Sequence, residues 1–398
     1  MVQGMSEDRL KRVADHMDAY VEDGKLPCAV CLVNRRGRET FFYSVGKSDV
    51  ENDRDVQRDT VFRIYSMSKP VTSVALMMLY ELGKFQLDDP VSKYVPSWKN
   101  LRVYESGEGD KIKTRPTKKP MTIKHLLTHT AGLTYGFMDN HPVDALYRQR
   151  GVEGGGSRTL ESMIEHLSEI PLLYDPGSLW RYSFATDVCG YLVQRFGDCD
   201  LDEFVKREIS SPLGLEDTDF HVRKESADRL AACYQHTRDG FDLQDASKDS
   251  RYLQRPTFLS GGGGMVSTVD EYQRFAQMLL NKGEFHGVRI LGRKTVEYMS
   301  SNHLPGNADL SAMGQPVFSE TSFEGIGFGL GFSVVIDPAA ASVLDSPGEY
   351  AWGGAASTYF WIDPIEQLSV VFMTQLLPSS TWPIRRELKT LVYQSFVD

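Results

Sequence analysis

A serine three residues before a lysine occurs twice in this sequence, as Ser66 and Lys69 in "SMSK" and as Ser44 and Lys47 in "SVGK". Such a pair can perform nucleophilic chemistry, because a lysine amine can take the serine proton and leave an oxygen able to attack a carbonyl carbon. The two side chains must then share a face, and the amine must be uncharged near neutral pH. These two requirements decide which of the two pairs can be catalytic.

Ser66 lies where a predicted strand gives way to a predicted helix. A helix beginning near Met67 places Lys69 one turn on, with the two Cβ atoms about 5–6 Å apart. No acidic residue occurs between positions 60 and 81 to hold the ammonium charged, and the positive end of the helix dipole disfavours that charge. Ser68 is turned about 100° from Lys69 and is the poorer candidate nucleophile. On spacing alone a surface lysine beside a helix cap is the commoner case, so the pair needs corroboration.

Ser44 ends an alternating segment that reads as a strand, and Gly46 precedes Lys47. Residues three apart in a strand point to opposite faces. The spacing of this second pair is therefore interpreted as chance.

The elements that must position Ser66 and Lys69 are strands at both ends of the chain and helices between them. Alternating or β-branched segments predict strands at 29–34, 40–45 and 61–65 and again after about residue 325, and helical patterns fill most of the stretch between. This order predicts a sheet lobe interrupted by a helical insertion. We expect residues 1–75 and 225–398 to form a discontinuous α/β domain, residues 76–224 a mainly helical domain, and the active site to lie between them.

Capping and turn residues bound the outer elements. Ser6 is predicted to cap a first helix, and Asp363 with Pro364 marks a hairpin turn. Pro383 opens a last helix. The expected apolar faces of the two helices are Leu10, Val13, Met17 and Val21, and Ile384, Leu388, Leu391 and Phe396.

Composition narrows the function classes. The chain has 398 residues and a formal net charge of −10, which disfavours binding to nucleic acid or to an anionic membrane. It has no apolar run near the roughly 20 residues of a membrane helix and no secretory leader pattern. Its five cysteines are odd in number and scattered, which favours reduced thiols. We therefore expect a cytoplasmic protein.

Three motifs in order, "SMSK", "WRYSFATDVCGYL" and "EYAWGGAAS", resemble those of the serine β-lactamase and penicillin-binding-protein superfamily. The closest branch is that of the family VIII carboxylesterases, which are similar to class C β-lactamases. The likeness extends over most of the chain, through "HLLTHTAGL" and "SGGGGMVST" to the C-terminal strands. It implies a β-lactamase-like fold of class α/β plus all-α, with an antiparallel sheet flanked by helices and an inserted helical domain.

The resemblance assigns three catalytic elements. Tyr182 matches the tyrosine of the family's Tyr-x-Asn element, although Phe184 replaces its asparagine. A tyrosine beside Ser66 and Lys69 could relay the serine proton to the leaving group; taken alone, Tyr182 reads more simply as a core aromatic residue.

The third element is Lys-Thr-Gly in lactamases, and Trp352, Gly353 and Gly354 stand in its place. Loss of that lysine removes a cation for a penicillin carboxylate, and tryptophan offers an apolar wall for a neutral ester. By family analogy the amides of Ser66 and Ala355 form the oxyanion hole.

Two further residues are weaker candidates. Tyr135 in "GLTYGF" is expected to line the substrate pocket, as is Phe184. Asp187, five residues beyond Tyr182, either orients a catalytic partner without touching substrate or is a charge on a helix surface.

Four other patterns are set aside. His125 and His129 have a spacing that can bind zinc, but the glutamate of H-E-x-x-H and a third ligand are missing. Ser260 to Gly264, "SGGGG", lacks the lysine of a phosphate loop and is interpreted as a flexible loop bordering the site. Thr268 and Glu271 form a predicted capping box. Cys28 and Cys31 lie in an alternating strand and are expected to face opposite sides.

The sequence thus predicts a serine carboxylesterase that hydrolyses short-chain esters through an acyl-enzyme on Ser66, with Lys69 and Tyr182 as general base and acid. It needs no cofactor and no metal ion, and its expected partner is a small-molecule ester. An acyltransferase, a weak β-lactamase and a D-amino-acid peptidase remain alternatives on the same scaffold. A non-enzymatic binding protein is the remaining alternative, and oligomeric state is not readable from the sequence.

Overall fold

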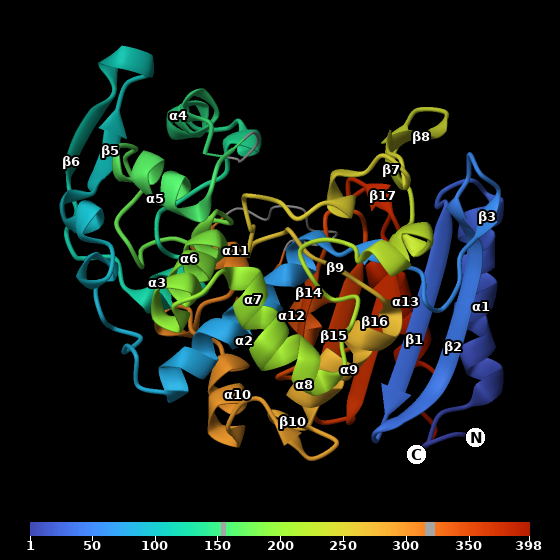
Figure 1. The fold of residues 1–398 in the computed structure, drawn as a ribbon. Helices are drawn as coiled ribbons and strands as arrows, with labels where there is room; N and C mark the ends of the chain where they lie inside the picture. The colour runs from blue at the N-terminus through green and yellow to red at the C-terminus, as the bar shows by residue number, and fades with distance from the viewer. Residues whose placement is uncertain (153–156, 315–322) are drawn as a thin grey trace.

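The computed structural model describes residues 1–152, 157–314 and 323–398. At its centre is an eight-stranded sheet with the strand order β12-β13-β14-β15-β16-β1-β2-β3, and every neighbouring pair is antiparallel (Figure 1). The strands are β1 Cys28–Arg35, β2 Arg38–Asp49, β3 Arg54–Asp55, β12 Ile326–Phe328, β13 Ser333–Val335, β14 Tyr350–Gly353, β15 Tyr359–Asp363 and β16 Leu368–Met373. The predicted antiparallel sheet, built from both ends of the chain, is confirmed.

Pairing of β1 with β16 joins the two ends, with Val30 opposite Met373. Because side chains alternate along a strand, β1 contributes to two separate apolar cores. Cys28, Val30 and Leu32 belong to the core shared with the helices of the serine side. Ala29, Cys31 and Val33 belong to the core beneath the terminal helices. Cys28 and Cys31 therefore lie on opposite faces, as predicted.

The two terminal helices pack together on one face of the sheet (Figure 1). Helix α1, Glu7–Glu22, is capped by Ser6, whose side chain accepts a hydrogen bond from the amide of Arg9. Its buried face includes Tyr20, whereas the predicted Val21 is only half-buried. Helix α13, Ile384–Tyr393, buries Ile384 and Leu388 as expected but ends before Phe396. Asp363 closes the predicted β15–β16 turn by accepting from the amides of Ile365 and Glu366.

The other face of the sheet carries helix α9, Val269–Leu280, and beyond it the helices that surround α2, Ser68–Glu81. Helix α2 is buried on nearly every side, which fits its apolar sequence. The remaining helices are α3 Ile123–Leu127, α4 Pro142–Arg150, α5 Leu160–Ser168, α6 Ala185–Gly197, α7 Leu201–Val205, α8 Ser211–Leu213, α10 Arg293–Met299, α11 Leu310–Met313 and α12 Pro338–Ala341. The short strands outside the main sheet are β4 Phe62–Arg63 with β9 Val266–Ser267, β5 Arg102–Ser106 with β6 Lys113–Pro116, β10 Glu284–Phe285 with β11 Val288–Arg289, and β7 Cys233–Thr237 with β8 Gly240–Asp245 and β17 Leu376–Leu377.

Three local predictions need correction. Strand β2 runs on to Asp49 instead of ending near residue 45, because its pairing continues from β1 to β3. The predicted strand at 61–65 shrinks to the two residues of β4. Thr268 caps α9, but the Glu271 carboxylate accepts from the Asp217 amide and the Thr218 hydroxyl instead of completing a capping box.

Strand β2 also resolves the second Ser-Lys pair. The Lys47 ammonium forms ion pairs with Asp53 at 2.9 Å and Asp55 at 2.6 Å on the surface. Lys47 is thus paired with surface carboxylates, and Ser44 lies opposite Val30 within the strand, which agrees with the interpretation of chance spacing.

Among the described residues, no helix combines the length and the apolar character needed to cross a lipid bilayer.

Candidate active site

The serine turn, Ile64–Ser68, connects β4 to α2. A 3₁₀ turn over Tyr65–Met67 precedes the helix, and Tyr65 has a left-handed backbone with φ of 42°. Such a conformation costs a non-glycine residue on the order of 1–3 kcal/mol and is common at functional sites. Ser68 holds the turn, because its Oγ donates to the Tyr65 carbonyl at 2.6 Å and accepts from the Met265 amide at 3.1 Å. Ser68 is fully buried, so it is a structural residue, and Ser66 is the serine that faces the pocket.

Lys69 lies one helical turn beyond Ser66, as the spacing predicts. Its Nζ donates to the Ser66 Oγ at 3.2 Å and to the Gly262 carbonyl at 2.7 Å. The same nitrogen lies 4.3 Å from the centroid of the Tyr182 ring. The side chain is 1% exposed. A single buried amine thus contacts the candidate nucleophile, the candidate proton relay and one loop carbonyl.

That carbonyl belongs to the glycine loop, Ser260–Gly264. Asp187, in the first turn of α6, accepts from the Ser260 Oγ at 2.6 Å and from the Gly262 amide at 3.1 Å. A Cβ on Gly262 would lie 2.5 Å from the Asp187 carboxylate, so only glycine fits. The loop borders the site as predicted, but these bonds fasten it, so the expectation of flexibility is not supported.

Asp187 is 1% exposed, so the alternative of a helix-surface charge is wrong. Burial raises the pKa of its carboxyl, while the charge of Lys69 and the hydrogen bonds from Ser260 and Gly262 act in the opposite direction. Asp187 thereby fixes the glycine loop through hydrogen bonds, and the loop in turn accepts a hydrogen bond from Lys69. It also supplies a carboxylate near the amine that the local sequence around Lys69 lacks.

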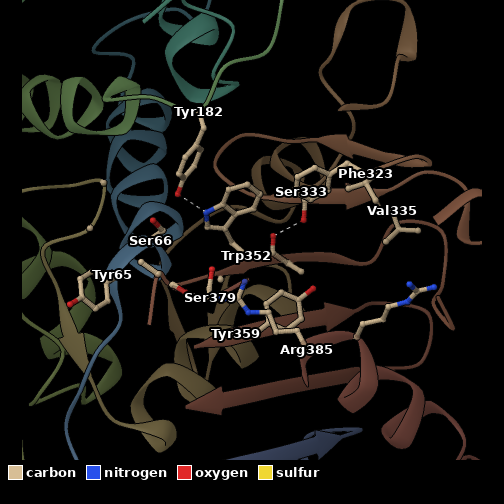
Figure 2. Close-up of a pocket in the computed structure, with 18 of the residues that line it drawn as sticks. Tyr65, Ser66, Tyr182, Phe323, Ser333, Val335, Trp352, Tyr359, Ser379 and Arg385 are labelled. Atoms are coloured by element: carbon tan, nitrogen blue, oxygen red, sulfur yellow. Dashed lines mark hydrogen bonds between the residues drawn. The ribbon is translucent and has the colours of Figure 1, made fainter. Parts of the chain in front are cut away.

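Tyr182 projects into the pocket from the segment just before α6. Figure 2 shows its hydroxyl pointing toward Trp352 and the side of the pocket that holds Ser66. The Trp352 Nε1–H donates to this hydroxyl at 3.2 Å. Rings of Tyr135, Trp180 and Trp352 lie 5.5–6.1 Å from the Tyr182 ring. The phenol is therefore both packed and oriented.

The two histidines of "HLLTH" have separate tasks. His125 accepts the Thr122 amide through Nδ1 and so closes a capping box at the start of α3. The ring of His129 lies 5.1 Å from that of Tyr182, with the hydroxyls of Ser183 and Thr186 near its two nitrogens. Burial, and then the charge of Lys69, hold the pKa of His129 well below its usual value, so the ring is neutral. The described residues contain no cluster of three or more His, Cys, Asp or Glu side chains that could hold a metal ion.

Strand β14 supplies the opposite wall through Trp352, Gly353 and Gly354. A Cβ on Gly354 would collide with the carbonyl of Ile64, so the glycine lets the strand end approach the serine turn. The Gly354 carbonyl accepts from the Ser357 amide at 3.1 Å, which forms a tight turn with Ala355 at its second position. Among the hydrogen bonds between described residues, the Ala355 amide has no acceptor, and Ala355 lines the pocket.

Aromatic side chains form the third wall. Tyr135 packs edge-on against Phe184 at 4.6 Å and stacks on Phe137 at 4.7 Å. Lys69 Nζ lies 5.7 Å from the Tyr135 ring centroid. The predicted pocket residues Tyr135 and Phe184 thus border the site, and Phe137 extends the wall to the surface, where it is 53% exposed.

These walls enclose a pocket of about 430 Å³. It contains every candidate named from the sequence except Lys69, which lies beneath Ser66. The sequence reading missed its far end (Figure 2). That end is formed by Phe323, Ile326, Ser333, Val335, Ala341, Val343, Asp345, Glu349, Tyr359, Ser379, Arg385, Arg386 and Lys389. The strands and the last helix that carry most of them were predictable, but no local pattern indicates that they meet in one cavity.

The arrangement can perform acyl transfer. It offers a hydroxyl with an amine in hydrogen-bond contact, a phenol beside that amine, and the pocket-lining residue Ala355, whose amide bonds to no acceptor among the described residues. The cavity is lined mainly by aromatic and aliphatic groups, which suits a carbon-rich substrate.

Comparisons with known proteins show the family to which this chain is similar. The family model described as Beta-lactamase matches residues 13–394. Protein Rv1367c of Mycobacterium tuberculosis is 35% identical over 363 residues, which cover 89% of this chain and 87% of that protein. Esterase EstB of Burkholderia gladioli is 29% identical over 397 residues, which cover 94% of this chain and 93% of that protein. The solved structure of EstCE1, described as a hydrolase with promiscuous acyltransferase activity, superposes with a TM-score of 0.82 at 28% identity over 97% of this chain and 99% of that one.

Proposed function

Since this chain belongs to the β-lactamase family, we propose that it is a serine carboxylesterase that works through a covalent acyl-enzyme on Ser66. The observation that carries the proposal is the 3.2 Å hydrogen bond between Lys69 Nζ and Ser66 Oγ at the floor of the pocket. The chain has the β-lactamase and penicillin-binding-protein fold, and the proteins related to it include esterases and acyltransferases.

In the first half-reaction, Ser66 Oγ attacks the ester carbonyl carbon. Its proton passes to the basic pair formed by Lys69 and Tyr182, whose ring lies 4.3 Å from the amine. The resulting tetrahedral intermediate collapses when the carbon–oxygen bond to the alcohol breaks. Tyr182 then returns a proton to the departing alkoxide, and the acyl group remains on Ser66.

In the second half-reaction, water attacks the acyl-enzyme and gives its proton to the same basic pair. The carboxylic acid leaves, and Ser66 regains its proton. In both halves the negative charge develops on the former carbonyl oxygen, and the amides of Ser66 and Ala355 are proposed to stabilise it, at about 3 kcal/mol for each donor.

The chemistry of the walls favours neutral esters over β-lactams. Trp352 replaces the cation that the family's Lys-Thr-Gly element offers to a substrate carboxylate, and its indole is instead engaged with Tyr182. EstB and EstCE1 are described as an esterase and a hydrolase, which supports the same choice. We propose short-chain esters as the first substrates to test.

The test is a panel of p-nitrophenyl esters of increasing acyl length, with the chromogenic cephalosporin nitrocefin alongside. We expect turnover of the short esters to exceed that of nitrocefin and to vanish in a Ser66→Ala variant. Ser44→Ala, taken from the other Ser-Lys pair, is the matched control and should keep wild-type turnover. Ester hydrolysis that survives Ser66→Ala would overturn the proposal.

Acyl transfer to an alcohol is the second candidate, because EstCE1 is described as having promiscuous acyltransferase activity. Hydrolysis and transfer share the acyl-enzyme and differ only in whether water or an alcohol attacks it. Adding a primary alcohol to the ester assay and quantifying new ester against free acid separates the two. A product mixture dominated by new ester would identify a transferase.

Three expectations from the sequence also remain proposals. We propose a cytoplasmic location, a small-molecule partner rather than nucleic acid or membrane, and the domain division at 76–224. Limited proteolysis tests the boundary at residue 224, where Lys224 and Glu225 are exposed and cleavage should concentrate. The other boundary falls inside the buried helix α2, where no cleavage is expected.

A further inference from the structure

Arg385, in the first turn of α13, lies at the far end of the pocket and contacts the end of β14 (Figure 2). Its Nη2 donates to the Gly354 carbonyl at 2.6 Å and to the Thr358 carbonyl at 2.9 Å. A Cβ on Gly353 would lie 2.7 Å from the guanidinium carbon. Glycine at position 353 therefore leaves the space in which this cation lies.

The two carbonyls belong to the turn that presents Ala355. The Gly354 amide donates to the Thr358 carbonyl at 2.9 Å, and the Ser357 amide donates to the Gly354 carbonyl at 3.1 Å. Arg385 thus adds one charged donor to each of the two carbonyls that close the turn. A guanidinium that bridges two carbonyls in this way fixes their relative position.

The Gly354 carbonyl and the Ala355 amide are two ends of one peptide group. A hydrogen bond to the oxygen of a peptide withdraws electron density from its nitrogen, which makes its N–H a stronger donor. A charged donor has a larger effect than a neutral one. The cation therefore acts through a single peptide group on the amide proposed for the oxyanion hole.

We propose that Arg385 is a positioning residue for ester hydrolysis, which fixes the Gly354–Thr358 turn and polarises the Ala355 amide toward the developing oxyanion. This inference rests on the proposed function. Arg385 need not touch the substrate, because its effect passes through the peptide group.

The expected effect follows from two magnitudes. One oxyanion-hole donor is worth about 10²–10³-fold in kcat. Hydrogen bonds in a chain strengthen one another by about 10–30%, which corresponds to about 2- to 8-fold in kcat from polarisation alone. Loosening of the turn adds to this loss.

The test compares Arg385→Met, which keeps the length of the side chain and removes both bonds, with Arg385→Lys, which keeps a cation. Arg274→Gln is the matched control, because Arg274 is exposed, donates to the Gly214 carbonyl at 2.6 Å and does not line the pocket. The measurements are kcat and KM for p-nitrophenyl acetate and the inhibition constant of phenylboronic acid, which forms a tetrahedral adduct with an active-site serine. Thermal unfolding checks that each variant is folded.

We expect Arg385→Met to lower kcat by about 2- to 8-fold or more, with KM within twofold of wild type. Arg385→Lys should lower kcat less. The inhibition constant of the boronic acid should rise by the same factor as kcat/KM falls, because both report the tetrahedral state. Arg274→Gln should keep kcat within twofold.

A folded Arg385→Met variant with wild-type kcat would overturn the inference, as would a loss confined to KM with unchanged boronic-acid inhibition. If Arg385→Met does not fold, Arg385→Gln, which also removes the cation, decides by the same two criteria. Ester turnover that survives Ser66→Ala would refute the proposed function itself. A wild-type rate in Arg385→Met together with an inactive Ser66→Ala removes the inference alone.

Discussion

Replacing Trp352 with phenylalanine should slow ester hydrolysis about 5- to 12-fold while the protein stays folded. In the structure the Trp352 Nε1–H donates to the Tyr182 hydroxyl at 3.2 Å. The Trp352 ring also packs 5.5 Å from the ring of Tyr182 and 5.3 Å from that of Phe328. Phenylalanine keeps an aromatic ring at this position and removes the donor together with one ring of the indole.

The magnitude comes from the change in charge on the Tyr182 oxygen. A hydrogen bond to a neutral acceptor contributes about 0.5–1.5 kcal/mol, and one to a charged acceptor about 1.5–3 kcal/mol. If Tyr182 carries negative charge while it takes or returns a proton, the indole stabilises that charged form by about 1–1.5 kcal/mol more than the neutral phenol. At 1.4 kcal/mol for each factor of ten, this difference is about 5- to 12-fold in kcat.

Steady-state kinetics with p-nitrophenyl acetate measures the effect, and thermal unfolding confirms the fold. Trp382→Phe is the control, since the Trp382 indole donates to the Lys25 carbonyl at 3.1 Å and does not line the pocket. It should leave kcat unchanged. A folded Trp352→Phe enzyme with wild-type kcat would refute the reasoning, because Tyr182 would then carry no charge that the indole stabilises.

Three further variants test the supporting structure. Ser68→Ala should lower the free energy of unfolding by about 1–3 kcal/mol, because it leaves the buried Met265 amide without its acceptor; an unchanged urea midpoint would contradict this role. Asp187→Asn should lower kcat about tenfold with little change in KM, since a neutral side chain holds the glycine loop less firmly than the carboxylate does; a kcat within twofold of wild type would argue against it. Burial lowers the pKa of His125 to about 4, so below about pH 6.5 the unfolded chain binds the proton that the folded chain refuses, and the wild type loses about 1–2 kcal/mol of stability by pH 5. His125→Gln keeps a capping side chain and should show a smaller loss between pH 7.5 and pH 5; equal losses in the two proteins would exclude the histidine as the cause.

The part of the site that depends on local spacing could be predicted from the sequence. Ser66 and Lys69 share a helical turn, so their contact follows from where the helix begins. Ser44 and Lys47 could be rejected for the same reason, because a strand separates residues three apart. The sheet at both ends of the chain was equally readable, because its strands carry alternating or β-branched residues.

The contacts that tune the site join segments far apart in the chain. Three segments meet at the amine: Asp187 comes from α6, the Gly262 carbonyl from the glycine loop and Lys69 from α2. No local sequence pattern predicts that they contact one another. No acidic residue lies next to Lys69 in the sequence, yet the fold brings the Asp187 carboxylate near the Lys69 amine. Likewise, the glycine pair after Trp352 indicates close approach of another backbone, but only the fold shows that Arg385 occupies that space.

Strand length was misjudged for a similar reason. The predicted strand stops at residue 45, before the polar residues Lys47, Ser48 and Asp49, but pairing with β1 and then β3 supplies hydrogen bonds that propensity alone does not predict.

The central claim is that Ser66 is the nucleophile. Incubation with a fluorophosphonate, followed by peptide mapping of the labelled protein by mass spectrometry, tests it most directly. We predict one adduct on Ser66, formed in step with the loss of esterase activity and absent from Ser66→Ala. An adduct on another residue that tracks the loss of activity, or full activity after Ser66 is labelled, would contradict the account.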